Sequence, residues 1–237
     1  MAEGSSMSRF WDERARENAW WYVDSRLDFA NPDVERFWAD GVTTLARVLE
    51  SVDVTIGPQD TVVDIGCGVG RLSRAASERA AHVYAVDVSS EMIERARTYN
   101  AHLDNVEWLV GDGRHLNGVP DAAADGVFSH VVFQHVPDPQ ITLSYVTEMG
   151  RVLRPGGWAA FHVSNDPSVH RPRTGGLRGA IDRWKGRAPR GGRNPAWLGS
   201  AVELDDLRRT ADAAGLDTER VEGEGTQWCF VRLRRRA

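Results

Sequence analysis

The stretch VVDIGCGVGRLS, from Val62 to Ser73, constrains the fold of this chain more than any other. An apolar run ends in an acid and is followed by Gly66, Gly68 and Gly70, after which the sequence becomes polar and competent to form a helix. In α/β proteins, a strand that runs into a glycine turn and then a helix forms a ligand crevice at the carboxyl end of the strand. A dinucleotide fingerprint would need a glycine where Arg71 stands, because the helix packs close to the strand there. The pattern therefore favours a ligand without a pyrophosphate.

Strand-like and helix-like segments alternate from residue 61 onward, which predicts a parallel, doubly wound sheet. The expected strands cover residues 62–65, 82–86, 106–110, 126–132, 158–163, 218–221 and 226–233. The expected helices cover residues 72–79, 91–102, 139–153 and 203–214, with a short one at 177–184. Before the first strand, Asn31-Pro32 separates an aromatic-rich segment from a helix that Asp33 opens, and residues 1–8 are expected to be irregular.

Length and composition are those of one sizeable enzyme domain. A chain of 237 residues can bury a hydrophobic core without disulfide bonds. Its net charge of -5 is no general signature of nucleic-acid binding. Cys67 and Cys229 allow neither a disulfide framework nor a paired-cysteine metal site, so no metal is expected. No apolar stretch approaches the roughly 20 residues that span a bilayer, and the first ten residues lack the apolar core of a signal peptide. These features predict a cytoplasmic protein.

Five landmarks follow one another in the order typical of the class I S-adenosylmethionine (SAM) dependent methyltransferases, which this sequence resembles. They are VVDIGCGVGRLS, VYAVDVS with Asp87, WLVGDGRHL with Asp112, DGVFSHVVFQHVPDP from Asp125, and RVLRPGGWAAFHVS from Arg151. The resemblance implies a Rossmann-like class I methyltransferase fold: a seven-stranded, mostly parallel sheet with an antiparallel last strand and helices on both faces. We expect an N-terminal helical lid at residues 1–57, a SAM-binding core at 58–164, a basic cap insertion at 165–200, and a C-terminal helix and hairpin at 201–237.

The resemblance places the cofactor at the carboxyl ends of the expected strands. Asp87 lies roughly 20 residues after the glycines, where a carboxylate can accept both ribose hydroxyls. By resemblance, Asp64 orients the glycine loop and reaches the methionine ammonium, and Asp112 accepts the adenine amino group. Helix capping is the alternative role for Asp64, and an ordinary Asp-Gly turn is the alternative for Asp112. The full set of cofactor-binding candidates is Asp64, Gly66, Gly68, Gly70, Arg71, Asp87, Val88, Met92, Asp112, Gly113, Arg114 and Ser129.

Methyl transfer requires an acceptor that is aligned in line with the methyl carbon and shielded from water. An alcohol or an acidic C–H acceptor also needs a base, and histidine suits this near neutral pH. His130 and His135 are the candidate catalytic bases, with a packing role as the alternative for His135. The candidate acceptor-binding residues are Trp20, Trp21, Tyr22, Phe133, Gln134, His162 and Trp197. Simple packing of the N-terminal segment on the sheet is the alternative for the first three aromatics.

Two absent features narrow the class of acceptor. The segment SHVV stands where amino-methylating relatives carry an Asn/Asp-Pro-Pro-Tyr/Phe motif, and neither cysteine suits carbon methylation of a pyrimidine. We therefore predict in-line transfer to oxygen of a small-molecule acceptor, with S-adenosylhomocysteine (SAH) as product and no DNA or membrane partner. Between residues 165 and 200, eight basic residues stand against two acidic ones, which would suit an anionic acceptor. The alternatives are an RNA methyltransferase that uses this insertion and a non-catalytic SAM-binding partner protein; the oligomeric state stays open.

Overall fold

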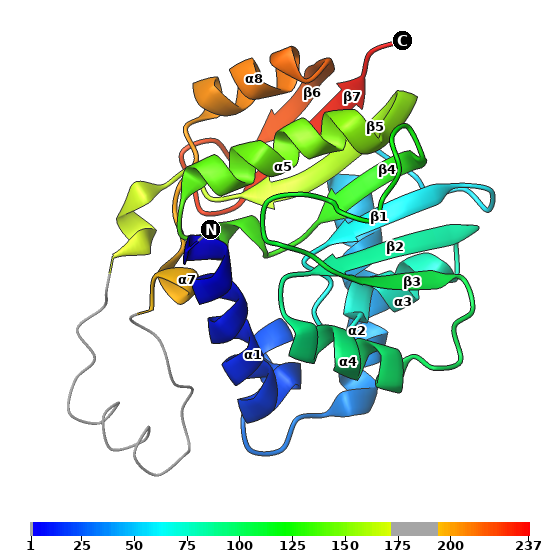
Figure 1. Cartoon of the computed structure of the whole chain (residues 1–237), viewed down its shortest axis with the longest axis vertical. Coiled ribbons are helices and arrows are strands. Elements are labelled where there is room, and N and C mark those ends of the chain that lie inside the picture. Colours follow the sequence, from blue (N-terminus) through cyan, green and yellow to red (C-terminus); the bar gives the residue numbers. More distant parts are fainter. Residues whose placement is uncertain (1, 172–193) are drawn as a thin grey trace.

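The structure is a computed structural model that describes residues 2–171 and 194–237, with side chains from Ser6 onward. Its centre is a seven-stranded sheet in the order β3-β2-β1-β4-β5-β7-β6 (Figure 1). The strands are β1 (Thr61–Ile65), β2 (His82–Asp87), β3 (Val106–Val110), β4 (Ala124–Ser129), β5 (Leu153–Val163), β6 (Leu216–Glu222) and β7 (Cys229–Arg235). The first five are parallel, whereas β7 runs antiparallel to both β5 and β6. The predicted fold class is confirmed.

Helices cover both faces of this sheet (Figure 1). On one face lie α2 (Val34–Ser51), α3 (Arg71–Ser77) and α4 (Ser90–Tyr99), and the other carries α5 (Pro139–Val152) and α8 (Leu204–Ala213). The helix α2 begins after Asp33, whose side chain accepts the backbone N–H of Arg36 as an N-cap. Its apolar stripe, which includes Leu45 and Leu49, packs against β1 and α3. The short elements η1 (Phe133–His135), η2 (Pro167–His170) and α7 (Pro195–Leu198) complete the described chain.

The N-terminal helix α1 (Ala2–Val23) runs beside α4 and reaches α7 (Figure 1). It is kinked at Asn18, where the backbone leaves the helical region with φ -167° and ψ 87°. The Asn18 side chain accepts the N–H of Trp21 and donates to the carbonyl of Phe29, so it caps the segment after the kink. The expectation of irregular structure over residues 1–8 was wrong, because the helix begins at Ala2.

Three strand boundaries differ by three residues or more from the sequence-based expectation, one of them the start of β7, which lies at Cys229 and not at residue 226. The strand β4 ends at Ser129, three residues early, because Val131 has a φ of 60°, outside the β region. The strand β5 begins at Leu153, five residues early, because Leu153 pairs with Ala124 of β4. The helix expected at residues 177–184 lies outside the described residues, as does most of the basic insertion. Over the ranges that the structure covers, no helix combines the length and the apolar character that crossing a membrane requires.

Candidate active site

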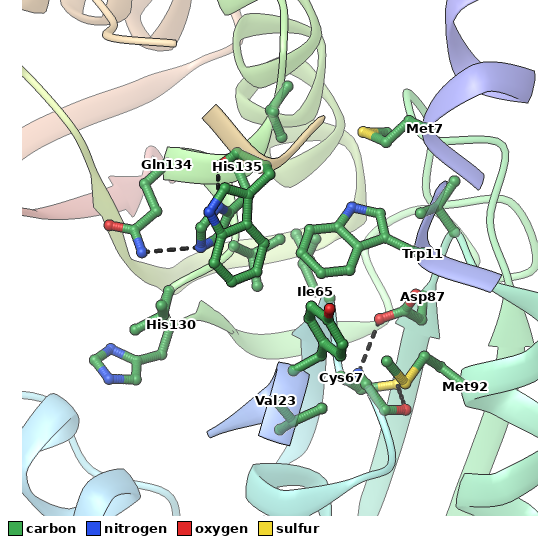
Figure 2. A pocket seen from close by; sticks show the side chains of 18 of the residues that line it. Met7, Trp11, Val23, Ile65, Cys67, Asp87, Met92, His130, Gln134 and His135 are labelled. Carbon is green, nitrogen blue, oxygen red and sulfur yellow. Dashed lines mark hydrogen bonds between the residues drawn. The ribbon is translucent and has the colours of Figure 1, made fainter. Parts of the chain in front are cut away.

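A cavity of about 520 Å³ lies at the carboxyl ends of β1, β2 and β4, under α1 (Figure 2). This is the point where the strand order reverses between β1 and β4, which is where doubly wound sheets bind ligands. The glycine turn after β1, the end of β2 and the loop after β4 form its floor, and α1, α7 and the loop between β6 and β7 form its walls. The volume is that of a small-molecule site.

The glycine turn needs its glycines for two different reasons. Gly66, Gly68 and Gly70 all have positive φ, at 74°, 55° and 88°. A Cβ on Gly66 would lie 2.4 Å from the Val132 side chain, so this glycine lets the loop after β4 approach the turn. A Cβ on Gly70 would lie 2.4 Å from the Trp108 ring, and Gly70 does not line the cavity. Gly66 and Gly68 therefore shape the ligand site, whereas Gly70 serves helix packing.

Asp87 ends β2 with its carboxylate at the cavity floor. One oxygen accepts the N–H of Gly68 at 2.9 Å and the other accepts the N–H of Ser89 at 2.8 Å. Burial raises the pKa of Asp87 to about 6. Asp12 of α1 lies close by, because it accepts the Ser89 hydroxyl at 2.7 Å. The carboxylate is thus fixed in place by backbone donors, with lone pairs left for a ligand.

Asp64 is the second buried carboxylate of the cavity floor. It accepts the Ser73 hydroxyl at 2.6 Å, and burial raises its pKa to about 7. Ser73 lies in the first turn of α3, and its backbone N–H also favours the Asp64 carboxylate. Asp64 therefore contacts the start of this helix, as the capping alternative expects, and it faces the cavity beside Gly66.

A chain of hydrogen bonds fixes the protonation of His135. Its Nδ1 lies 2.8 Å from the carbonyl oxygen of Trp197, and since a carbonyl only accepts, this nitrogen carries the proton. Its Nε2 then accepts from the Gln134 amide at 3.2 Å, and the Gln134 oxygen accepts from the Gln227 amide at 2.9 Å. Burial lowers the pKa of His135. His135 is a neutral imidazole with both nitrogens engaged, which suits positioning better than proton transfer.

His130 occupies a different part of the cavity from His135 (Figure 2). Its ring stacks on Phe230 at 6.3 Å between centroids, and its Nδ1 is buried with no hydrogen-bond partner among the described residues. Burial lowers its pKa to about 3. The neighbouring His162 donates from Nε2 to the carbonyl of Gln227 at 2.8 Å and has a pKa lowered by burial to about 4. Both imidazoles are therefore neutral around pH 7.

Aromatic rings from α1 and α7 form the wall opposite the glycine turn. Trp11 meets the His135 ring edge-on at 5.7 Å, and Tyr22 meets Trp197 edge-on at 5.7 Å. Figure 2 shows Trp11 between His135 and Asp87. These large, rigid rings give this side of the cavity an apolar surface.

Most of the predicted site residues meet at this cavity, and the others lie elsewhere for identifiable reasons. Those that line it are Asp64, Gly66, Gly68, Arg71, Asp87, Val88, Met92, His130, Gln134, His135, Tyr22 and Trp197. Those that do not are Gly70, Asp112, Gly113, Arg114, Ser129, Trp20, Trp21, Phe133 and His162.

Asp112 shows why one of these candidates lies elsewhere. It forms an exposed turn in which one carboxylate oxygen accepts the N–H groups of Arg114 and His115, each at 2.8 Å. Partial burial opposes ionisation, but the hydrogen bonds from His115 outweigh it and lower the pKa of Asp112 to about 2. The arrangement matches the turn-forming alternative for Asp112.

Three of the remaining candidates pack in the protein interior or form a hydrogen bond between strands. Trp20 stacks on Tyr99 at 4.5 Å, and Phe133 is fully buried in the core. The Ser129 hydroxyl donates to the carbonyl of Ile65 at 2.8 Å.

Several lining residues were not among the sequence-based candidates. They are Met7, Trp11, Val23, Val131, Tyr145 and Gln227, with others. Trp11 lies within the expected lid at residues 1–57, but the candidates from that lid were Trp20, Trp21 and Tyr22, nine or more residues further along. Gln227 carries no local signal, since its role depends on Gln134 from a segment far away in the sequence.

Comparisons with known proteins agree with this geometry. Residues 63–161 match the family described as a methyltransferase domain. The trans-aconitate 2-methyltransferase of Azoarcus sp. is 38% identical over 138 residues, which is 56% of this chain and 51% of that protein. The malonyl-[acyl-carrier protein] O-methyltransferase of Serratia marcescens is 38% identical over 104 residues, 44% of this chain and 38% of that protein. The chain thus spans about half or less of the length of these curated relatives.

Solved structures share the fold. A SAM-dependent methyltransferase from Mesorhizobium loti has a TM-score of 0.61 at 20% identity, covering 80% of this chain and 96% of that one. Another from Aquifex aeolicus has a TM-score of 0.51 at 24% identity, covering 80% and 88%. The chain therefore has the fold of these SAM-dependent methyltransferases. Residues 63–161, less than half of the chain, are the part that matches the methyltransferase domain family.

Proposed function

We propose that this protein transfers a methyl group from SAM to an oxygen atom of a small-molecule acceptor. The observation that carries the proposal is the continuity of the cavity, which joins the glycine turn and Asp87 to a wall of aromatic and imidazole rings. Relatives named for O-methylation, and for trans-aconitate and malonyl substrates, support an oxygen acceptor.

The residues at the floor of the cavity fit SAM. Gly66 and Gly68 line the cavity, and a Cβ would lie 2.4 Å from Val132 at Gly66 and 2.6 Å from Val23 at Gly68, so only glycine lets these walls approach the turn. Asp87 offers lone pairs for ribose hydroxyls, and Val88 and Met92 provide apolar surface for the adenine. When bound, SAM supplies a methyl group already activated by its positive sulfur.

The chain's own contribution is mainly positioning and the exclusion of water. Trp11, Tyr22 and Trp197 enclose the cavity and hold an acceptor against the floor. His135 is engaged on both nitrogens, so His130 is the better candidate to accept a proton. Because burial lowers the pKa of His130 to about 3, it is a weak base. This favours an acceptor oxygen that arrives ionised or acidic over a simple alcohol.

Calorimetry with SAM and SAH, followed by labelled methyl transfer to a panel of acids and phenols, tests the proposal. Asp87→Asn should weaken SAM binding roughly 10- to 100-fold, the effect of losing a charge-assisted hydrogen bond. Asp205→Asn, an exposed change on α8, is the matched control and should bind as wild type does. Wild-type protein that binds neither SAM nor SAH would refute the proposal. Base-labile methyl products would identify ester oxygen as the site of transfer.

A further inference from the structure

The two ring nitrogens of His130 lie in different surroundings. Nδ1 is enclosed and has no hydrogen-bond partner among the described residues. Nε2 also forms no hydrogen bond within the part of the chain that the structure describes, but it is not enclosed. His130 lines the cavity on the side away from Asp87 (Figure 2), and Phe230 stacks on its ring at 6.3 Å with the planes 20° apart. Nε2 is therefore the nitrogen that a ligand in the cavity can reach.

The enclosure of Nδ1 indicates which nitrogen of His130 carries the proton. Inside proteins, a buried N–H without a partner is rarer than an acceptor with an unused lone pair. The neighbouring His162 has the same arrangement, because its Nδ1 is enclosed and unpartnered while its Nε2 donates to the carbonyl of Gln227 at 2.8 Å. The same tautomer in His130 leaves the lone pair on the enclosed Nδ1 and presents the N–H of Nε2 to the cavity.

The surroundings of His130 keep its ring neutral. Burial is the largest influence and lowers the pKa of His130 to about 3. The charges of Arg71 and Arg26 and the ring of His162 act in the same direction, whereas Asp24 raises this pKa. A neutral ring with its lone pair enclosed is poorly placed to take a proton from an acceptor. It is well placed to donate a hydrogen bond to an oxygen that has already lost its proton.

Aromatic rings link His130 to the mouth of the cavity. The ring of His162 lies 6.1 Å from that of His130 and stacks on Trp228 at 5.0 Å with the planes 25° apart. Trp228 lines the cavity with half of its surface exposed, and Val169 beside the same cavity is also exposed. Flat and apolar surfaces of this kind favour an acceptor with an aromatic ring over a flexible aliphatic acid.

The charges around the cavity favour an acceptor with a single ionised oxygen. Among the described lining residues, the arginines are Arg71, which is 8% exposed and pairs with Asp24, and Arg171, which is exposed. A buried carboxylate needs a cation or several donors, whereas a phenolate spreads its charge over the ring and offers one oxygen to one donor. The single positive sulfur of bound SAM balances one phenolate, but it does not balance a di- or tricarboxylate.

We propose that the acceptor is an acidic phenol whose oxygen accepts the Nε2–H of His130 and whose ring lies toward Trp228. This inference rests on the proposed function, and it names the substrate class and makes His130 a hydrogen-bond donor. The phenol loses its proton to water before transfer. Its oxygen then forms the bond to the methyl carbon, and the carbon–sulfur bond breaks with its electron pair left on sulfur. The phenolate and the sulfonium thereby give two products in which these atoms are uncharged.

The tautomer of His130 can be measured in the ligand-free protein. In protein labelled with ¹⁵N-histidine, two-bond proton–nitrogen correlations distinguish the protonated ring nitrogen from the one that holds the lone pair. The resonances of His130 are identified by their loss in His130→Gln. We expect a proton on Nε2 and none on Nδ1 throughout the neutral pH range. A proton on Nδ1, or a ring that titrates near neutral pH, would overturn the inference.

Binding of a phenol tests the substrate class without turnover. Sinefungin, a SAM analogue with an amino group in place of the methylsulfonium, fills the cofactor part of the cavity, and 4-nitrophenol is added at a pH where it is mostly un-ionised in water. We expect the absorbance of the bound phenolate. His130→Phe should weaken binding roughly 10- to 100-fold, the effect of losing a hydrogen bond to a charged group. His130→Gln keeps an N–H donor and should recover part of the affinity.

Two further variants complete this experiment. Trp228→Ala should weaken 4-nitrophenol binding roughly 2- to 10-fold, because an aromatic contact is lost. His102→Phe changes an exposed histidine outside the cavity and is the matched control, which should bind as wild type does. Thermal unfolding and sinefungin affinity check that His130→Phe folds. If it does not fold, His130→Gln and the tautomer of the wild-type protein still decide the role of His130.

A carboxylate on the same ring separates this inference from the proposed function. We expect 4-nitrobenzoate to bind the sinefungin complex more weakly than 4-nitrophenol. Tighter binding of 4-nitrobenzoate, binding of 4-nitrophenol only in its un-ionised form, or no binding of 4-nitrophenol would overturn the inference. Unchanged 4-nitrophenol affinity in a folded His130→Phe would do the same. Methyl transfer to carboxylic acids alone would keep the proposed function and overturn the phenol. If the proposed function fails, wild-type protein binds neither SAM nor SAH.

Discussion

Burial determines the protonation of the titratable side chains in the cavity. It raises the pKa values of Asp64 and Asp87, and it lowers the pKa values of His130 and His162. Both effects favour the neutral form of each group. At pH 7 the imidazoles are therefore neutral, Asp87 is mostly ionised because its pKa is about 6, and Arg71 is a buried cation that pairs with Asp24 at 3.4 Å.

Asp64 makes stability depend on pH. Its pKa is raised from 3.8 to about 7, so the stabilisation it contributes is complete below 3.8 and is lost as the pH rises through about 7. Asp64→Asn cannot ionise, so between pH 5 and pH 8 wild type should lose roughly 2–3 kcal/mol of unfolding free energy relative to this variant. Urea unfolding at the two pH values measures the difference. Asp205→Asn is the control, and parallel pH profiles for wild type and Asp64→Asn would contradict the assignment.

At the level of elements, α1 covers the cavity and contacts both α4 and α7. Asp12 accepts the Ser89 hydroxyl at 2.7 Å and the N–H of Glu91 at 3.2 Å, so its negative charge lies at the N-terminus of α4. Arg16 pairs with Glu91 at 2.7 Å. Met7 and Phe10 pack on Ala196 of α7. The helix thus joins α4 to α7, and the kink at Asn18 lets its last turn follow the cavity wall.

Asp12→Ala should weaken the attachment of α1 to the N-terminus of α4. It removes two accepted hydrogen bonds and a favourable charge at a helix N-terminus, which together amount to about 1–2 kcal/mol. Hydrogen exchange of amides in residues 8–23 should become roughly 5- to 30-fold faster, while the strands keep their protection. Glu13→Ala, an exposed neighbour on the same helix, is the comparison variant. Unchanged exchange in α1 would mean that apolar packing alone holds the helix.

For the whole molecule, the cavity joins segments that are far apart in the sequence. The hydrogen-bond chain from Trp197 through His135 and Gln134 to Gln227 ties α7, η1 and the loop between β6 and β7 together. A second long-range hydrogen bond joins β7 to the end of α2, because Arg232 donates to the carbonyl of Val52 at 2.8 Å. The N-terminal and C-terminal parts therefore complete one fold around the central strands.

Gln134→Leu should lower the free energy of unfolding. The substitution leaves His135 and Gln227 without their side-chain partner, and each unsatisfied buried group costs about 1–3 kcal/mol. We expect a loss of roughly 2 kcal/mol in the free energy of unfolding, measured in urea. Gln140→Leu, at an exposed position of α5, should stay within about 0.5 kcal/mol of wild type. If both variants are equally stable, the chain of hydrogen bonds adds nothing measurable.

The architecture was predictable because its signals are local. Alternating apolar runs and the glycines after Ile65 indicated the elements, and the seven-stranded, mostly parallel sheet with an antiparallel last strand followed from the resemblance. The end of β4 was not predictable, because the positive φ of Val131 arises where the loop packs over Gly66. Among the aromatics, sequence alone could not tell that Trp20 packs on Tyr99 while Trp11 faces the cavity.

The sequence by itself determined the class of fold and the place of the cofactor crevice, since a strand, a glycine turn and a helix are written in consecutive residues. Only the tertiary structure decided the chemistry of the walls. Whether His135 can take a proton depends on Trp197 and Gln134, and how closely Asp24 pairs with Arg71 depends on its hydrogen bonds from Arg26. The physical reason is that charge and protonation depend on burial and on partners brought from distant segments, which only the folded chain brings together.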